Sequence, residues 1–227
     1  VRVHEREIVP VPSTLTLTDA AAIPEAFMTA HDALFEQARL VAGERVLIHA
    51  VASGVGTAAL QLAASAGARI VGTSRTADKL ARCAELGAFT PIEVTEARFA
   101  DRVAAAVGGA DVVLDLVGAA YLSESLAAMA PQGRMIVVGL VGGVQAPLPL
   151  GVLLAKRLRV QGSVLRSRPL EEKAALARRF AAKVVPRFEA GALRPVVDAV
   201  VPMREIADAH RRLERNATVG KLVLSWG

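Results

Sequence analysis

Residues 45–62 read RVLIHAVASGVGTAALQL, an apolar run that passes through a turn of small residues into a helix-forming segment. The run at 46–51 is typical of a buried strand. Small residues at the turn, 53–56, let an anion approach the backbone, where free N–H groups and the positive end of a helix stabilise it. The stretch therefore predicts a strand, a turn that binds a dinucleotide pyrophosphate, and a helix.

The turn departs from the usual Gly-x-Gly-x-x-Gly pattern, because Val51 and Ser53 stand where the first two glycines would fall. A second apolar strand, RIVGT at 69–73, follows and completes a β-α-β unit of the expected ~30 residues. This context favours a dinucleotide site over the alternative, a glycine-rich turn without a ligand. The uncharged stretch 46–68 is long enough to suggest a membrane span, but His49 and the break at the turn argue against it.

The rest of the chain alternates strands with helices through short glycine-rich loops. Strands are expected at 90–94, 111–116, 134–138 and 158–165, and helices at 25–39, 77–86, 97–107 and 123–129, with a turn at 131–133. Such alternation implies an α/β fold, a doubly wound parallel (Rossmann) sheet. We divide the chain into an approach segment (1–24), the nucleotide-binding domain (25–168) and a C-terminal part (169–227). The last has a helix at 170–190, a strand at 196–201, a helix at 204–214 and a strand at 221–226.

Composition limits the partners and the compartment. The chain is 53% hydrophobic and 4% aromatic, and its net charge of +5 comes from scattered Arg and Lys. With few aromatic residues to interleave with the basic ones, nucleic acid is disfavoured as a partner and a dinucleotide is the expected anion. The single cysteine, Cys83, can form no internal disulfide, and no secretion leader is recognisable, so we expect a cytoplasmic protein.

The end of the second strand indicates which dinucleotide is bound. Sites that select NAD place a carboxylate there to bond the ribose 2′-hydroxyl, but residues 73–79 read TSRTADK. Ser74, Arg75 and Lys79 suit a 2′-phosphate instead, through charge-assisted hydrogen bonds. The sequence thus favours NADPH over NADH. The alternative is that Arg75 and Lys79 are surface charges, with Asp78 capping the helix.

Several separated motifs occur in one order along the chain: AAAIPEA at 20–26, VLIHA at 46–50, SGVGTAA at 53–59, LDLVG at 114–118, GLVGG at 139–143, SVLRSR at 163–168 and GKLVL at 220–224. In this combination the chain resembles the quinone oxidoreductase branch of the medium-chain dehydrogenase/reductase superfamily, most of all the p53-inducible NADPH quinone oxidoreductase group. Members of that family begin with a GroES-like catalytic domain of roughly a hundred residues, about the size of one ordinary domain. Residues 1–24 resemble its end, so we expect a remnant of this domain, with the chain either a fragment or naturally shortened.

The resemblance implies a set of cofactor contacts and no catalytic side chain. The NADPH contacts would be Thr29 at the nicotinamide; Ser53, Gly54, Val55 and Gly56 at the pyrophosphate; Ser74, Arg75 and Lys79 at the adenosine phosphate; Val117, Gly118, Gly139, Leu140, Val164, Leu165 and Arg166 along the nicotinamide half; and Asn216 closing over the cofactor. For each of these residues a purely structural role is the alternative.

Zinc is disfavoured, because Glu25 stands about where zinc alcohol dehydrogenases carry a thiolate ligand and the four histidines show no ligand spacing. Short-chain dehydrogenase chemistry needs Tyr-x-x-x-Lys, but Tyr121 is followed by Ser125 at that spacing. His49, flanked by apolar residues, is expected to be a satisfied core histidine.

We therefore expect a zinc-independent NADPH:quinone oxidoreductase that transfers a hydride to a quinone or enone. The alternatives are an enoyl reductase acting on activated alkenes, and a noncatalytic NADPH-binding module, since most of the catalytic domain is missing. Relatives pair the sheet edge equivalent to 158–165 across a two-fold axis, so a homodimer is expected, with no membrane partner.

Overall fold

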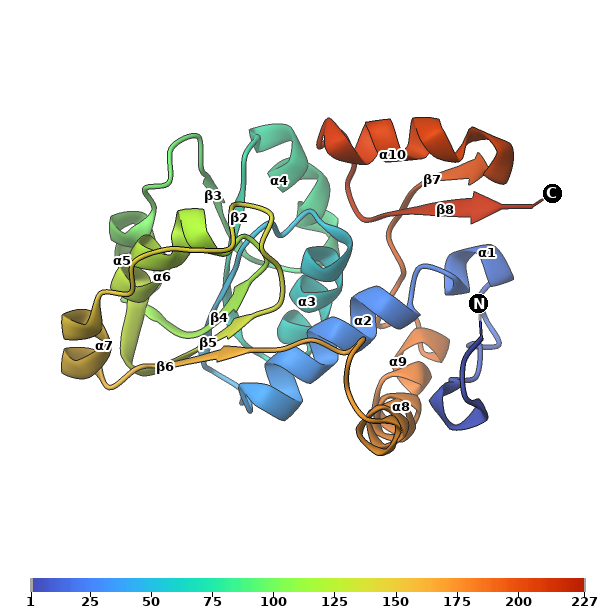
Figure 1. Cartoon of the computed structure of the whole chain (residues 1–227), viewed down its shortest axis with the longest axis horizontal. Coiled ribbons are helices and arrows are strands. Elements are labelled where there is room, and N and C mark those ends of the chain that lie inside the picture. The colour runs from blue at the N-terminus through green and yellow to red at the C-terminus, as the bar shows by residue number, and fades with distance from the viewer. Residues whose placement is uncertain (1, 227) are drawn as a thin grey trace.

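The computed structural model describes residues 2–226 and is built around a parallel sheet (Figure 1). The six strands lie in the order β3-β2-β1-β4-β5-β6. Their bounds are β1 (Arg45–Ile48), β2 (Arg69–Ser74), β3 (Thr90–Glu93), β4 (Ala110–Asp115), β5 (Met129–Val137) and β6 (Arg159–Gly162). This is the order of the doubly wound dinucleotide-binding fold, so the expected fold class is confirmed.

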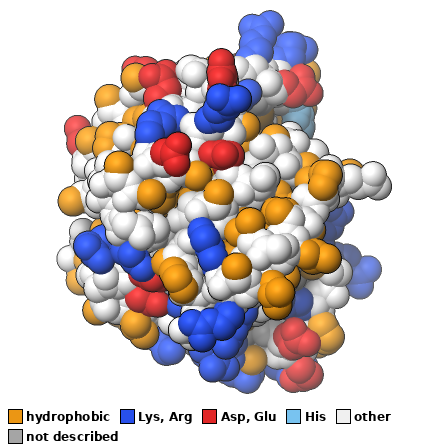
Figure 2. Space-filling model, turned by 90° about the vertical axis from the view of Figure 1, so that its left-hand side faces the viewer, with side chains coloured by type: hydrophobic (Ala, Val, Ile, Leu, Met, Phe, Trp, Pro, Cys, Tyr) orange, Lys and Arg blue, Asp and Glu red, His pale blue; other side chains and the backbone are white. Residues whose placement is uncertain are grey.

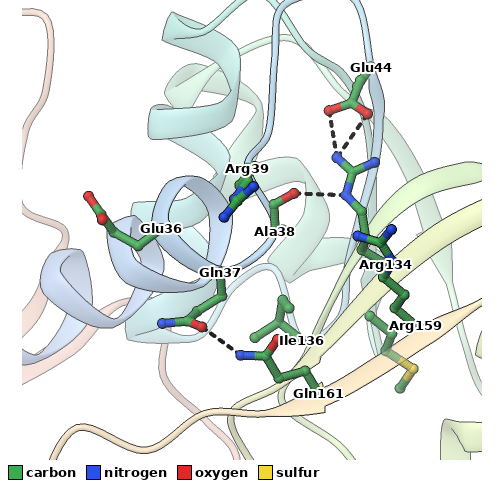
Figure 3. A pocket seen from close by; sticks show the side chains of 10 residues that line it. Glu36, Gln37, Ala38, Arg39, Glu44, Arg134, Ile136, Arg159 and Gln161 are labelled. Atoms are coloured by element: carbon green, nitrogen blue, oxygen red, sulfur yellow. Dashed lines mark hydrogen bonds and ion pairs between the residues drawn. The ribbon is translucent and has the colours of Figure 1, made fainter.

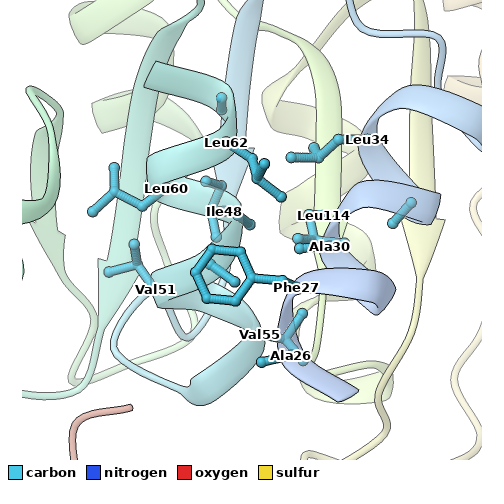
Figure 4. Close-up of a cluster of buried hydrophobic side chains, with 14 of the residues drawn as sticks. Ala26, Phe27, Ala30, Leu34, Ile48, Val51, Val55, Leu60, Leu62 and Leu114 are labelled. Carbon is cyan, nitrogen blue, oxygen red and sulfur yellow. The ribbon is translucent and has the colours of Figure 1, made fainter. Parts of the chain in front are cut away.

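Both faces of the sheet are covered by helices, which explains why its central strands are apolar without alternation. Along β1, Val46 and Ile48 pack into one core and Leu47 into the other. The first core lies beneath α2 (Pro24–His31) and α3 (Gly54–Ser65), where Phe27 sits among the leucines and valines of α3, β1 and β4 (Figure 4). The second lies beneath α5 (Ala100–Val107) and α6 (Leu122–Ala128).

The C-terminal part forms a separate parallel pair of strands, β7 (Val197–Pro202) and β8 (Lys221–Ser225), covered by α10 (Ile206–Glu214). The start of β8 is joined to the turn after β1, because the Gly220 N–H donates to the Ala52 carbonyl at 2.8 Å. The connection from the main sheet runs through α8 (Leu170–Lys183) and α9 (Val185–Glu189). At the N-terminus, a 3-10 turn (Glu5–Glu7) and α1 (Leu17–Ala20) precede α2, and α4 (Ala77–Cys83) follows β2.

Three local expectations were wrong in detail, and one helix was not expected. The helix expected at 25–39 is α-helical only to His31 and continues as a wider π-helix (Asp32–Gln37). The helix expected at 170–190 breaks after Lys183, and Pro186 occupies the first turn of α9. The turn expected at 131–133 lies within β5, where Gln132 adopts a left-handed φ of +63° and the register with β4 shifts, as in a β-bulge. The helix α7 (Leu150–Lys156) was not anticipated.

Within residues 2–226, no helix is both long enough and apolar enough to cross a membrane.

Candidate dinucleotide-binding cleft

A cleft of about 660 Å³ lies at the carboxyl ends of β1, β2 and β4. The strand order of the sheet reverses between β1 and β4, and ligands of doubly wound folds bind at this point. The lining comes from the turns after those strands, the loop after β5 and the segment that enters β8: Ala50, Ala52, Ser53, Gly54, Thr73, Ser74, Arg75, Lys79, Val117, Ala120, Tyr121, Val141, Gly142, Leu213, Asn216, Thr218, Gly220, Lys221 and Leu222.

The turn after β1 leaves backbone donors free at the start of α3. Ser53 caps the helix, since its Oγ accepts a hydrogen bond from the Gly56 N–H at 3.0 Å. Within the described residues, the N–H groups of Gly54 and Val55 have no acceptor. Two free N–H groups at the positive end of a twelve-residue helix can bind a phosphate oxygen.

The two glycines of this turn have different neighbours. A Cβ on Gly56 would lie 2.3 Å from the Ala50 carbonyl oxygen, so Gly56 allows the helix to pack against its own strand end. A Cβ on Gly54 would lie 2.6 Å from the Lys221 side chain, which lies across the turn. Gly54 therefore leaves room for a lysine from β8 beside the free N–H groups.

The residues that line the cleft at the end of β2 include two cations and no carboxylate; Glu93, at the end of β3, accepts from the Ala77 N–H at 3.2 Å and is not among the lining residues. Ser74, Arg75 and Lys79 line the cleft, and Arg75 has no side-chain partner among the described residues. Lys79 is 8% exposed, and its pKa is lowered by burial and by the neighbouring charges of Arg75 and Arg82. The structure brings these cations together, as an anion site requires. Asp78 lies in the first turn of α4 but does not cap it, since the N-cap residue is Thr76.

Behind the cleft, buried polar groups hold the strand ends in place. Asp115 is fully buried, and its carboxylate accepts from the N–H groups of Val117 at 2.7 Å and Gly118 at 3.1 Å, while burial raises its pKa. His49 lies between Thr73 Oγ1 at 3.0 Å and Ser125 Oγ at 2.9 Å. Burial lowers the pKa of His49 to about 3, so the ring stays neutral, as expected for a core histidine.

The expected cofactor contacts fall into three groups. Ser53, Gly54, Ser74, Arg75, Lys79, Val117 and Asn216 line the cleft, and Val55, Gly56 and Gly118 lie beside them in the same turns. Gly139 and Leu140 are in the loop after β5, next to Val141 and Gly142, which do line it. Thr29, in the last turns of α2, and Val164, Leu165 and Arg166, in the loop after β6, are not among the lining residues.

Lys221 and Tyr121 are lining residues that sequence reasoning missed. The Lys221 ammonium forms an ion pair with the carboxylate of Glu25, at the start of α2. The Tyr121 ring packs edge-on against His49, with centroids 5.0 Å apart. The sequence feature that could have indicated Lys221 is the Gly220-Lys221 pair just before an apolar strand. Gly220 has a φ of +83°, which favours glycine.

The side chains present do not form a zinc site. Among residues 2–226, no three His, Cys, Asp or Glu side chains come close enough to share a metal ion. Glu25 is paired with Lys221, and Cys83 is buried, which raises the pKa of its thiol to about 11.

The chain matches one protein family, and its relatives include quinone oxidoreductases. Residues 54–182 match the family described as "Zinc-binding dehydrogenase". The chain is 31% identical to the quinone oxidoreductases of Mus musculus and Homo sapiens, with 96% and 94% of the chain aligned. It spans 65% and 64% of their lengths.

Solved structures agree on the fold. A structure described as an NAD-dependent alcohol dehydrogenase superposes with a TM-score of 0.88 at 34% identity, over 99% of this chain and 63% of the other. The CurK enoyl reductase superposes with a TM-score of 0.82 at 30% identity, over 94% of this chain and 64% of the other.

Proposed function

The chain belongs to the zinc-binding dehydrogenase family, in the quinone oxidoreductase branch of the medium-chain dehydrogenase/reductase superfamily, and from this premise we propose that it binds NADPH and transfers a hydride to a quinone or enone. The observation that carries the proposal is the cleft at the switch point of the sheet, with its free N–H groups and basic rim. As part of the same proposal, residues 25–168 bind the dinucleotide, while 1–24 and 169–227 belong to the catalytic side.

The preference for NADPH rests on the rim formed by Ser74, Arg75 and Lys79. A 2′-phosphate placed there meets two cations and a hydroxyl, whereas a 2′-hydroxyl finds no carboxylate among the lining residues to accept its hydrogen bond. The Arg75 guanidinium, which has no side-chain partner within residues 2–226, can make a bidentate contact. Lys79 adds a second cation that is already partly desolvated, so less water must be displaced when the phosphate binds.

The pyrophosphate is held at the other end of the same turn. The N–H groups of Gly54 and Val55 donate to it, and Lys221 adds a positive charge on leaving Glu25. Asn216 and Val117 border the remaining space, and Thr29, Val164, Leu165 and Arg166 complete the nicotinamide side in the proposal. Bound NADPH supplies the hydride, and the chain contributes mainly the position and the exclusion of water.

The identity of the hydride acceptor distinguishes this proposal from its alternatives. Similarity to the CurK enoyl reductase favours an activated alkene as the second candidate. NADPH oxidation, followed at its nicotinamide absorbance with an ortho-quinone or with an enoyl thioester, distinguishes the two. We expect turnover with the quinone and a large loss in the Arg75→Gln variant. Turnover with the thioester alone supports the enoyl reductase, and binding of NADPH without any turnover supports a noncatalytic module.

A homodimer through β6 and a cytoplasmic location complete the proposal. All residues of β6 are exposed, so its outer backbone groups are available for pairing. Figure 2 faces the side of the molecule that carries α7, where apolar side chains gather between Lys and Arg. We expect Val160→Asp, on the edge, to shift sedimentation toward the monomer, while Val41→Asp, in a loop at 61% exposure, leaves it unchanged. A wild-type chain that sediments only as a monomer contradicts the dimer.

A further inference from the structure

A second hollow, of about 550 Å³, lies where β5 and β6 face the end of the π-helix and the loop after it (Figure 3). It shares no lining residue with the dinucleotide cleft. Its walls carry three arginines: Arg134 on β5, Arg159 on β6 and Arg39 on the loop. A volume of this size is in the range of small-molecule sites.

Two of the arginines are forced to be neighbours by the sheet. Arg134 and Arg159 are register partners on adjacent parallel strands, with Ile136 and Gln161 as the next pair on the same face. Neighbouring strands lie roughly 4.8 Å apart, and like charges placed side by side on them repel. The fold therefore places Arg159 beside Arg134, whose own charge is countered by Glu44, so that Arg159 is left without a carboxylate of its own on this face.

The carboxylates of the hollow are already engaged. Glu44 accepts two hydrogen bonds from Arg134 Nη2, both at 2.8 Å, and one from the Val41 N–H at 2.9 Å. Glu36 forms an ion pair with Arg179 at 3.0 Å, on α8 outside the hollow. Among the residues that the structure describes, no carboxylate pairs with Arg39 or Arg159.

The backbone presents Arg39 in an unusual way. Its φ is +53°, in the left-handed region that residues other than glycine rarely adopt. The corner is fixed on both sides, because the Ala38 carbonyl accepts from Arg134 Nε at 2.7 Å and the Leu40 N–H donates to Leu34 at 2.8 Å. Arg39 is thereby held on the wall that faces the sheet, and Figure 3 shows it across from Arg134 and Arg159.

We propose that this hollow binds a small polyvalent oxyanion, a phosphate ester or a polycarboxylate, through the guanidinium groups of Arg39 and Arg159, while Arg134, paired with Glu44, forms the wall between them. Guanidinium is the side chain best suited to bidentate contacts with both kinds of oxyanion. The site is independent of the proposed redox function and is distinct from the dinucleotide cleft.

The test is calorimetric titration of the full chain with pyrophosphate and, separately, with citrate, at constant ionic strength set with chloride. The two probes distinguish a phosphate from a carboxylate ligand. Because the dinucleotide cleft can also take up pyrophosphate, the titrations are run with that cleft filled by saturating NADPH, and we expect one saturable site per chain for at least one probe under this condition. The Arg39→Asn/Arg159→Gln variant should weaken it by about a hundredfold, since each charged hydrogen bond lost costs roughly tenfold. Asn at position 39 tolerates the left-handed backbone, so the variant should fold.

Two controls make the result decisive. Arg69→Gln/Arg98→Gln removes the same charge from exposed arginines elsewhere and should leave the affinity unchanged. Arg75→Gln/Lys79→Gln removes the cations of the dinucleotide cleft and should also leave it unchanged. The inference is overturned if neither probe binds the wild-type chain, if the control pair at 69 and 98 weakens binding equally, or if only the cleft variant abolishes it.

Discussion

The packing of α3 against the end of β1 requires that residue 56 has no side chain, and Gly56 meets this requirement. Because a Cβ there would lie 2.3 Å from one backbone oxygen and 2.6 Å from another, Gly56→Ala must move α3 away from the end of β1. We expect a loss of about 1–3 kcal/mol in the free energy of unfolding, measured by urea denaturation. The matched control is Gly151→Ala in α7, where an added Cβ would meet no atom within 4 Å apart from its chain neighbours and the backbone of its own helix, and the stability of this variant should stay the same or rise. Equal effects of the two changes would contradict this packing.

Lys221 and Glu25 form a pair that a bound pyrophosphate should separate. We expect Lys221→Met to weaken NADPH and NADH by the same factor, about tenfold, because both dinucleotides carry the pyrophosphate. Glu25→Gln should tighten both, since the lysine then has no competing carboxylate. Calorimetric Kd values measure this. An effect of Lys221→Met on NADPH alone would show that the ammonium contacts the 2′-phosphate instead.

The cleft residues that could be predicted from the sequence belong to one local motif. Ser53, Gly54, Arg75 and Lys79 follow strand ends of one β-α-β unit, so their place in the cleft follows from topology. Lys221 reaches the same turn from the far end of the chain, and only the folded contact between Gly220 and Ala52 brings it there. No spacing rule connects such distant positions.

Among the elements, the π-helix is held to the loop after β6 by a buried ion pair. The Asp32 side chain is 2% exposed, and its carboxylate accepts from both Arg168 Nη atoms, at 2.9 and 2.6 Å, and from Ser163 Oγ at 3.0 Å. Burial raises the pKa of Asp32, but the hydrogen bonds from Arg168, Gln37 and Ser163 outweigh it, so the pKa lies below its ordinary value.

This pair should stabilise the fold in a pH-dependent way. A depressed folded-state pKa contributes stability above the unfolded value of about 3.9, and the contribution is lost as the pH falls through the folded pKa. Asp32→Asn should therefore cost about 2–4 kcal/mol at neutral pH, with the difference shrinking below about pH 4. The control is Glu171→Gln, which removes an exposed pair with Arg6 and should cause no measurable change. A pH-independent difference would contradict the role of this carboxylate.

Helices and strands were predictable where periodicity was strong. The central strands β1, β2 and β4 are apolar runs, and each was expected within a few residues of its position, whereas β5 begins five residues before its expected start. The helix break before Pro186 and the bulge at Gln132 depend on local chemistry that periodicity does not carry. The π-helix begins at Asp32, whose partner Arg168 lies more than a hundred positions away, so no local pattern indicates this contact.

At the scale of the whole molecule, the order of the strands determines where a ligand can bind. The switch between β1 and β4 opens the cleft at one end of the sheet, and β7, β8 and α10 close one side of it through Asn216 and Lys221. The alternation of strands and helices predicted the first of these features. The closure of the cleft by β7, β8 and α10 was not predictable, because no sequence pattern indicates where the C-terminal strands pack on the main sheet.

The most direct test of the central claim is calorimetric titration of this chain with NADPH and NADH under one buffer and salt condition. We expect NADPH to bind at least about tenfold more tightly, and the difference to vanish in the Arg75→Gln/Lys79→Gln variant. Equal affinity for the two dinucleotides, a preference for NADH, or no binding of NADPH would contradict the assignment of the cleft.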